Sequence, residues 1–217
     1  MTELLIELTG TSPLAMHNIQ LADPLNDFAK AISEITGKRK KTESDMEEIA
    51  RLEFLGGLYY DPTIGVYVRT YAVLRAFEQA GKITRQGKSV MQGVAVLADK
   101  TPLVYEGPRE PQALWERPEF RWRGVVGVAG RRVVRMRPIF RKWSLSFEAE
   151  LVDEVIDLDD FVRIAEQAGR VEGLLEGRKL GNGRFRVNIV SDRKKRTNGR
   201  AVAAAVREAS DVEPVRS

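Results

Sequence analysis

The stretch GLLEGRKLGNGRFRV, residues 173–187, combines glycines with cations, and this combination can hold phosphate. Glycines let backbone N–H groups come close to a phosphate group, and neighbouring cations supply charge. The residues concerned are Gly173, Gly177, Gly181 and Gly183, together with Arg178, Lys179, Arg184 and Arg186. Their spacing differs from that of mononucleotide-binding loops. We therefore predict a glycine-rich bend that a nucleic-acid backbone can cross; the alternative is a bare turn with solvated cations.

Arginine dominates a second stretch, residues 121–142, which carries eight cations and no acidic residue. Guanidinium groups bind phosphate in a bidentate manner and stack on bases, and aromatic side chains add stacking platforms. The predicted nucleic-acid contacts in this stretch are Arg121, Trp122, Arg123, Arg131, Arg132, Arg135 and Arg137. In the alternative interpretation, the stretch is a solvated face that pairs with the acidic residues of 148–160.

Two further basic runs extend the candidate surface. KRKK, at the predicted end of a helix, consists of Lys38, Arg39, Lys40 and Lys41. Cations at this position also compensate the helix dipole, which is the alternative explanation for them. DRKKR, residues 192–196, opens a C-terminal segment with few large apolar residues. We expect residues 192–217 to form a mobile basic tail.

The chain contains one histidine, His17, and no cysteine. His17 is the candidate general base of an RNA-cleaving site, but no acidic or lysine partner lies near it in the sequence. A hydrogen-bonded loop histidine is therefore the favoured interpretation, and we assign no catalytic residue. The absence of cysteine excludes disulfides and zinc–thiolate sites, and one histidine excludes multi-histidine metal sites. We predict no cofactor and no metal.

Hydrophobic periodicity predicts the elements that position these residues. Strands are expected at 3–9, at 143–151, where apolar and polar residues alternate, and at 184–190. A β-hairpin is expected over 121–137, turning at Ala129 and Gly130. Helices are expected at 25–35, at 70–81, at 84–92 and at 158–168. A further helix begins near Thr42 or Ser44, with Ser44 and Glu47 as a capping box, and ends at Gly56 and Gly57.

This order of elements has no regular alternation of strand and helix, so a doubly wound parallel sheet is unfavourable. We predict an α+β fold with a mainly antiparallel sheet, whose closing strand–helix–strand unit fits one half of a ferredoxin-like fold. Hydrophobic residues make up 43% of the chain and charged residues 30%, which is typical of a soluble globular protein. No apolar run approaches the roughly 18 residues of a membrane span, and the N-terminus lacks a signal-peptide pattern.

Three segments support a family resemblance. They are the first strand running into GTSPLAMHN, then GVYVRTYAVLRAFEQAGK at 65–82, and the glycine-rich stretch at 173–187. Together they resemble the RAMP superfamily, and more closely the Cas7-like backbone proteins of CRISPR effector complexes. The segment 65–82 is similar to a strand-then-helix element of that family in which the helix bears an arginine, and Arg69 and Arg75 stand in it. The layout is also similar to uncharacterised proteins carried by bacteriophages.

The resemblance implies an RRM-like core within one RAMP-like domain at 1–191, with a helical insertion at about 25–57 and the basic hairpin at about 120–142. It also implies single-stranded nucleic acid lying across subunits that assemble side by side. We thus predict a non-enzymatic protein that binds single-stranded RNA or DNA as an oligomeric, backbone-type subunit. It would work away from membranes in the cytoplasm, that of the bacterial host cell if the protein is phage-encoded.

Two alternatives belong to other functional classes. One is a RAMP-type endoribonuclease that uses His17. The other is a phage structural or assembly protein whose basic hairpin contacts an acidic protein surface.

Overall fold

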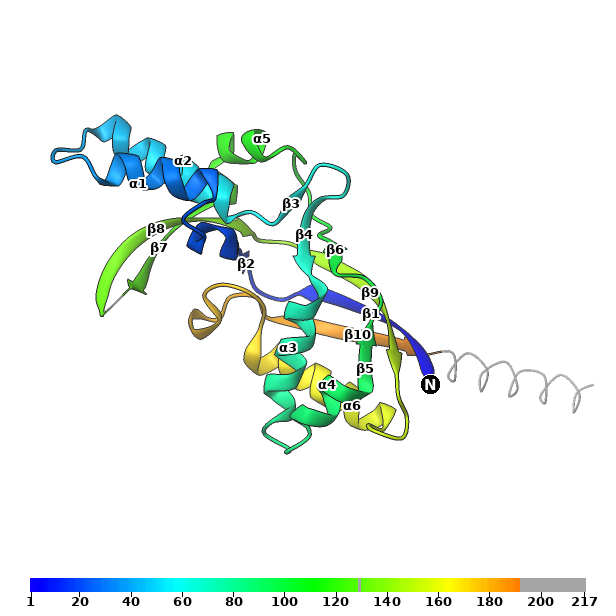
Figure 1. Ribbon diagram of the computed structural model, residues 1–217. Helices are drawn as coiled ribbons and strands as arrows, with labels where there is room; N and C mark the ends of the chain where they lie inside the picture. The colour runs from blue at the N-terminus through cyan, green and yellow to red at the C-terminus, as the bar shows by residue number, and fades with distance from the viewer. Residues whose placement is uncertain (129, 192–217) are drawn as a thin grey trace, which may run out of the picture.

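The computed structural model describes residues 1–128 and 130–191, with the side chains of 126–128 and 131 excepted. It is an α+β structure built on antiparallel sheets, which confirms the predicted class (Figure 1). The largest sheet has the strand order β10-β1-β9-β5, and neighbouring strands are antiparallel. Its strands are β1 (Thr2–Gly10), β5 (Val94–Val96), β9 (Ser144–Leu151) and β10 (Phe185–Ser191). The predicted tail at 192–217 and Ala129 of the predicted turn lie outside the described residues.

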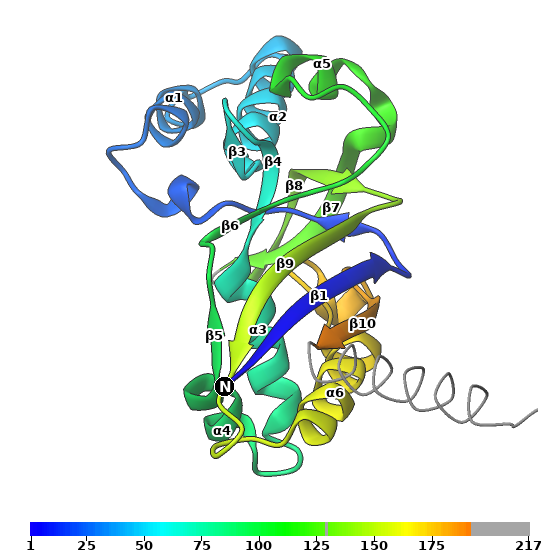
Figure 2. The same ribbon diagram turned by 90° about the vertical axis from the view of Figure 1, so that its right-hand side faces the viewer.

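Strict alternation explains the two central strands. In β1 the side chains of Leu4, Ile6 and Leu8 are buried while the residues between them are exposed. β9 repeats the pattern, as its sequence predicts, because every second residue of a strand points to the same face. One face of the sheet is therefore apolar, and Figure 2 shows the helices gathered on that side and the other side open.

Three helices cover the apolar face: α3 (Thr70–Gly81), α4 (Gly87–Gly93) and α6 (Leu158–Gln167). Phe77 of α3 packs edge-on against Phe161 of α6, with ring centres 5.6 Å apart, and both side chains are buried. A π-helical turn, η3 (Ala168–Glu172), extends α6 toward β10. A Cβ atom on Gly169 in this turn would lie 2.2 Å from the carbonyl oxygen of Phe185, so glycine permits the close contact.

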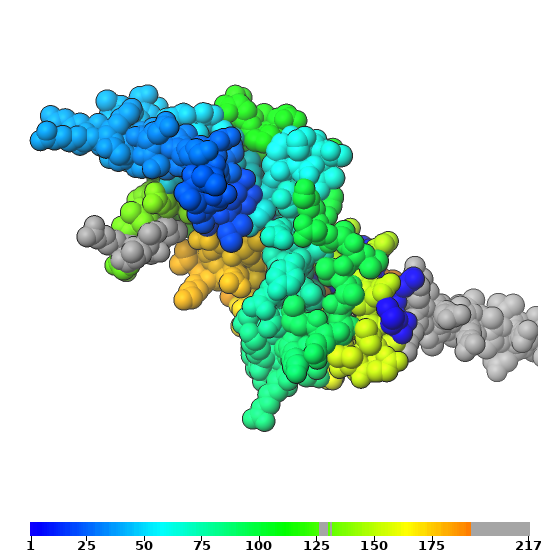
Figure 3. Space-filling model, viewed as in Figure 1, coloured from blue at the N-terminus to red at the C-terminus, as the bar shows by residue number. Residues whose placement is uncertain are grey.

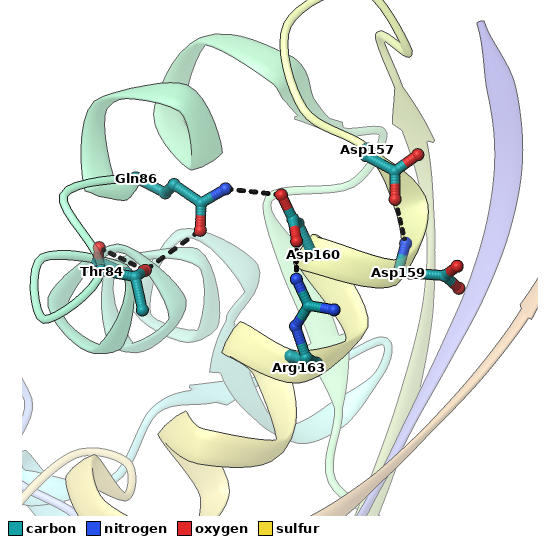
Figure 4. A network of polar contacts seen from close by, with 7 residues as sticks. Thr84, Gln86, Asp157, Asp159, Asp160 and Arg163 are labelled. Atoms are coloured by element: carbon teal, nitrogen blue, oxygen red, sulfur yellow. Dashed lines mark hydrogen bonds and ion pairs between the residues drawn. The ribbon is translucent and has the colours of Figure 1, made fainter.

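A polar network fastens the turn between α3 and α4 to the start of α6 (Figure 4). Gln86 donates its amide N–H to Asp160 at 2.7 Å and accepts a hydrogen bond from the Thr84 hydroxyl at 3.1 Å. Asp160 also pairs with Arg163, and Asp157 caps the helix by accepting the N–H of Asp159. These acidic residues thus position α6.

The basic hairpin forms a second sheet with the order β2-β8-β7. Its strands are β2 (Leu14–Ala15), β7 (Arg121–Val128) and β8 (Arg131–Phe140), and Gly130 at the turn has a positive φ of 78°. A third sheet has the order β3-β4-β6, with β3 (Tyr60–Asp61), β4 (Gly65–Arg69) and β6 (Lys100–Pro102). The predicted hairpin over 121–137 is therefore confirmed.

A pair of helices, α1 (Asp27–Thr36) and α2 (Glu43–Gly57), projects from the body next to the hairpin (Figure 1). The capping box of α2 differs from the predicted one. Thr42 is the N-cap, its side chain accepts the N–H of Asp45, and Asp45 accepts the N–H of Thr42. Asp45 also pairs with Lys38 at 2.6 Å, a contact that favours this earlier start over the one at Ser44. The other short helices are α5 (Pro111–Glu116), η1 (Ile19–Ala22), η2 (Pro118–Phe120) and η4 (Arg178–Leu180).

Candidate nucleic-acid interface

Strand pairing divides the arginines of the hairpin between two faces. β7 and β8 pair in antiparallel register from Arg121↔Pro138 to Val128↔Arg131, and alternate side chains point to opposite faces. One face, which we call the loop-side face, carries Trp122, Gly124, Val133, Arg135 and Arg137. The opposite helix-side face carries Arg121, Arg123, Val125, Arg132, Val134 and Met136. The side chain of the predicted contact Arg131 lies outside the described part of the chain.

The helix-side face turns toward α2 and α5. The guanidinium carbon of Arg121 lies 4.9 Å from the centre of the Trp115 ring, which in turn packs against Phe54 of α2. A groove of about 520 Å³ runs between these elements, with Arg121 and Arg123 among its lining residues. This face of the hairpin is therefore partly occupied by the helices.

The glycine-rich loop folds back onto the segment that follows β1. The N–H of Gly183 donates to the Pro13 carbonyl at 2.7 Å, and the N–H of Glu176 donates to the Ala15 carbonyl at 3.1 Å. Ala15 lies in β2, which pairs with β8 at Ile139 and Phe140. The loop is thus held beside the base of the hairpin, and Figure 3 shows it in gold next to the blue segment before α1.

Hydrogen bonds within the chain occupy much of the loop's backbone. The N–H groups that donate to other chain groups are those of Gly173, Leu174, Glu176, Leu180, Gly181, Asn182 and Gly183. A Cβ atom on Gly183 would lie 2.2 Å from the carbonyl oxygen of Leu174, and φ is positive at all four glycines. The predicted bend is present, but Gly183 serves close packing inside the loop and its N–H is not free to hold phosphate.

His17 lies among charged side chains that are far from it in the sequence. The negative charges of Glu53 and Glu176 and the positive charge of Arg137 act on its ring. Desolvation by the surrounding chain, followed by the charge of Arg137, lowers the pKa of His17 below its ordinary value. The ring is therefore mostly neutral at pH 7, the state that a general base requires. His17 is exposed and its ring forms no hydrogen bond or ion pair with the described residues, so Glu53 and Glu176 act on it only through their charges.

Two arginines of the loop-side face are engaged with the protein itself. Arg135 pairs with Glu53 of α2 at 2.7 Å, and the second oxygen of this carboxylate accepts the N–H of Met136 at 2.8 Å. Arg137 is only 6% exposed, and its Nη1 donates to the Met136 carbonyl at 3.1 Å. Its Nε is buried and has no hydrogen-bond partner among the described residues.

The tip of the glycine-rich loop carries free cations. Arg178 and Lys179 lie in the 3₁₀ turn η4, flanked by Gly177 and Gly181 in left-handed conformations. Both side chains are exposed, and neither forms an ion pair with any residue that the structure describes. They can therefore contact phosphate without first breaking an existing salt bridge.

The remaining predicted cations lie in several other places. Lys38, Arg39, Lys40 and Lys41 occupy the connection between α1 and α2, at the far end of the helix pair (Figure 1). Lys38 pairs with Asp45, and the Lys41 ammonium donates to the Lys38 carbonyl at 3.1 Å. Lys38 and Lys41 are thus engaged in contacts within the connection itself, and the last turn of α1 carries no basic residue.

Four other predicted arginines are also spread out. Arg69 pairs with Asp99 at 3.5 Å, and Arg75 pairs with Glu78 on the same helix. Arg186 is exposed on the open face of the largest sheet, whereas Arg184 is half-buried and its Nη1 lacks a hydrogen-bond partner within the described chain. The fold therefore does not gather all the predicted cations into one patch.

The open face of the largest sheet is acidic. Alternation in β1 and β9 places Glu3, Glu7, Glu148 and Glu150 on it. Asn188 of β10 donates to Glu7 at 2.7 Å on the same face. Carboxylates repel phosphate, so this face is unfavourable for a nucleic-acid backbone.

The acidic stretch 148–160 has partners other than the hairpin. Asp153 pairs with the N-terminal amine at 3.3 Å and accepts a hydrogen bond from Thr2. Asp160 is engaged by Gln86 and Arg163, as Figure 4 shows. The ion pair that holds the hairpin comes instead from Glu53. No hairpin arginine whose side chain the structure describes forms an ion pair with a residue of 148–160.

Comparison with known proteins provides no family assignment. No protein-family model matches the sequence, and no curated protein matches it either. Within residues 1–128 and 130–191, no three side chains of the kinds that ligate metals gather into a possible metal site. In the same part of the chain, no helix has the length and hydropathy needed to cross a membrane.

Proposed function

We propose that the protein binds single-stranded nucleic acid, RNA or DNA, without cleaving it, over a surface formed by the glycine-rich loop and the loop-side face of the hairpin. The observation that carries the proposal is the docking of the loop on residues 12–15 beside β8. This docking brings the exposed cations Arg178 and Lys179 beside the base of the hairpin, whose loop-side face carries Trp122.

The chemistry of this surface suits a flexible strand. Exposed cations attract phosphates and release counterions, while an aromatic ring stacks on bases of any sequence. Trp122 is half-buried, and its ring lies over Gly124, where a Cβ atom would come within 2.6 Å of it. Because the open sheet face is acidic, we place the strand at the loop and hairpin and not across the sheet.

We further propose that the core is ferredoxin-like or RRM-like and that the chain is a RAMP-type, Cas7-like subunit acting in an oligomer. The strand order β10-β1-β9-β5, with α3 between β1 and β5 and α6 between β9 and β10, supports this reading. The helix pair 27–57 would then be an insertion between the first strand and the first core helix, as the domain prediction states.

The test is fluorescence anisotropy with labelled mixed-sequence single-stranded RNA and DNA over a range of salt concentrations. We expect binding that weakens as salt rises. The double charge reversal Arg178→Glu/Lys179→Glu should reduce the slope of log affinity against log salt by about 1.4, since each phosphate contact contributes roughly 0.7. The matched control is Arg85→Glu/Lys88→Glu, an equal charge change at exposed residues on the turn and helix after α3. If both double variants lose the same affinity for nucleic acid, the proposed position of the binding surface is wrong. If the wild-type protein binds no nucleic acid, the proposed function is wrong.

A second candidate function, RNA cleavage, is favoured by the surroundings of His17. A neutral imidazole beside a buried guanidinium could take the proton from a ribose 2′-hydroxyl while the guanidinium neutralises the phosphate. In this scheme the 2′-oxygen forms a bond to phosphorus while the bond to the 5′-oxygen breaks. The 5′-oxygen takes up a proton from the protonated His17 or from water, so that a cyclic phosphate and a 5′-hydroxyl result.

Cleavage is tested with RNA that carries a single 2′-deoxy substitution at the cut position. A nuclease of this kind cleaves RNA, spares the substituted strand, and loses activity in His17→Ala while binding is kept. If the wild-type protein leaves RNA intact, this second candidate is removed and the binding proposal is unaffected.

A further inference from the structure

Strand β8 has a free edge over part of its length. One edge pairs with β7, and the other pairs with β2 only at Ile139 and Phe140. Beyond that pairing, the Pro138 carbonyl accepts the N–H of Met16, and the N–H of Met136 donates to Glu53. The chain thus covers this edge from Phe140 back to Met136.

Beyond Met136, the next residues of β8 whose backbone N–H and C=O groups point away from β7 are Val134 and Arg132. In an antiparallel pair, the N–H and C=O of one residue point to the same side, and the side alternates along the strand. Their N–H and C=O groups therefore point the same way as the N–H of Met136, away from β7. No hydrogen bond joins them to any residue that the structure describes. Such an edge is a template for another strand.

A groove of about 300 Å³ runs along this edge. Its β8 wall is Val133–Met136, and its other wall includes Met46, Ile49 and Ala50 of α2. The side chains of Met46 and Val134 are 50% and 55% exposed, so apolar surface is left open beside unpaired backbone. The polar lining includes the cations Lys41, Arg123 and Arg135.

We propose that this edge binds an extended segment of a partner protein with alternating apolar and acidic residues, which adds to β8 as a strand. The backbone of the segment would pair with Val134 and Arg132, and its apolar side chains would enter the groove between Val134 and Ile49. Because side chains alternate between the two faces of a strand, its acidic side chains would point to the loop-side face, beside Arg135, while Lys41 and Arg123 add positive charge to the groove itself.

Charge disfavours the most obvious other occupant, β8 of a second copy. Two β8 strands pairing edge to edge would bring the Arg132 residues of both copies close together, and like charges on paired strands are destabilising. An acidic segment avoids that repulsion, because its charge is opposite to that of the hairpin. The proposal does not depend on the nucleic-acid surface, because Arg178 and Lys179 lie outside this groove.

The probe is a fluorescent heptapeptide that alternates glutamate and valine, measured by anisotropy against the nucleic-acid-free protein. Val134→Pro removes one outward N–H and leaves the ladder to β7, just as Pro138 of the same strand does. We expect it to weaken peptide binding at least about tenfold, the equivalent of one backbone hydrogen bond and its local fit. Val134→Thr keeps the N–H and the branched shape, and should change binding by less than about threefold.

A second measurement does not depend on how the variant folds. Two peptides are compared, one N-methylated at its valines and the other at its glutamates. Only one of these two sets of N–H groups faces β8, so one peptide should lose binding and the other should keep it. A heptapeptide with lysine in place of glutamate should not bind. Absence of glutamate–valine binding, or equal binding by both methylated peptides, overturns the proposal. If an oligonucleotide binds the wild-type protein in competition with the peptide, and Val134→Pro abolishes that oligonucleotide binding, the edge is a nucleic-acid site instead.

Discussion

His17 illustrates how the fold gives one side chain surroundings that its sequence neighbours do not supply. The charges that act on its ring belong to Glu53, Arg137 and Glu176, which come from α2, β8 and the glycine-rich loop. They approach because a two-residue strand, β2, pairs with β8 and also accepts the N–H of Glu176. The chemistry of the only histidine therefore depends on three distant segments.

We predict that the pKa of His17, measured by NMR from its ring protons, lies below the ordinary value of 6.5. In Arg137→Met the nearby positive charge is removed while much of the buried volume remains, so this pKa should rise. The signal is unambiguous because the chain has one histidine. An unchanged or lower pKa in Arg137→Met would contradict the assignment.

The same shift predicts a pH dependence of stability. Because the pKa of His17 is lower in the folded state, the unfolded state binds more protons between the two values. The contribution of His17 to the free energy of unfolding is therefore fully present above about pH 6.5 and falls as the pH drops through the folded-state pKa. Urea unfolding at about pH 5 and 7.5 measures it. The free energy of unfolding should differ less between these two pH values in His17→Gln than in the wild-type protein. If the difference is the same in both proteins, the lowered pKa of His17 is contradicted.

Glu53 is the residue on which the position of the hairpin relies most. It is 5% exposed and accepts from both Arg135 and the backbone of Met136. Glu53→Ala leaves these donors unpaired, and should lower the free energy of unfolding by about 2–3 kcal/mol, a value reduced for the partial exposure of Arg135. Glu48→Ala, which removes a surface pair on the same helix, should cost at most about 1 kcal/mol. Similar urea midpoints for both variants would be inconsistent with this role.

At the scale of elements, the sequence predicts helices and strands with regular apolar patterns, but it does not predict features that depend on long-range contacts. The alternation of β9 and the apolar spacing of α3 predicted both elements nearly to their ends. The capping box of α2 was misplaced because Thr42–Asp45 and Ser44–Glu47 both fit the local pattern, and only the contact of Asp45 with Lys38 separates them. The two-residue strand β2 has too little pattern to be recognised.

The arginines of the hairpin form one cluster along the sequence but not in the fold. The two-residue period of a strand divides Arg121 and Arg123 from Arg135 and Arg137. That period alone predicts two faces with different partners. The burial of Arg137 and its approach to His17 could not be predicted, because they depend on where β2 and α2 dock.

The glycine-rich loop provides a prediction at this scale. At Gly183, φ is +72° and a Cβ atom would lie 2.2 Å from the Leu174 carbonyl, whereas Gly181, at +88°, has open space around it. Gly181→Ala should therefore cost only the left-handed strain, about 1–2 kcal/mol. Gly183→Ala adds a backbone clash and should cost about 3 kcal/mol or more. Thermal unfolding compares the two, and equal losses would contradict the close packing described for this loop.

At the scale of the whole molecule, charge is segregated although the net charge is only +4. The open sheet face carries glutamates, the hairpin and loop carry arginines and lysine, and the helix pair ends in a basic turn. A polyanion is therefore repelled by one side of the molecule and attracted by another. The loop-side and helix-side faces of the hairpin are two docking surfaces that can be distinguished by fluorescence. Trp122 lies on the first, and Trp115 of α5 lies against the second.

Tryptophan fluorescence should report which side binds nucleic acid. Trp122 lies on the loop-side face, Trp115 lies under Arg121 on the helix side, and Trp143 is buried with its indole N–H donating to the Ser12 carbonyl. A strand bound at the loop stacks near Trp122 and quenches it. We predict that quenching by a single-stranded oligonucleotide is lost in Trp122→Phe and kept in Trp115→Phe. The glutamate–valine peptide should leave Trp122 unaffected. The reverse pattern with the oligonucleotide would move the nucleic-acid surface to the helix-side groove.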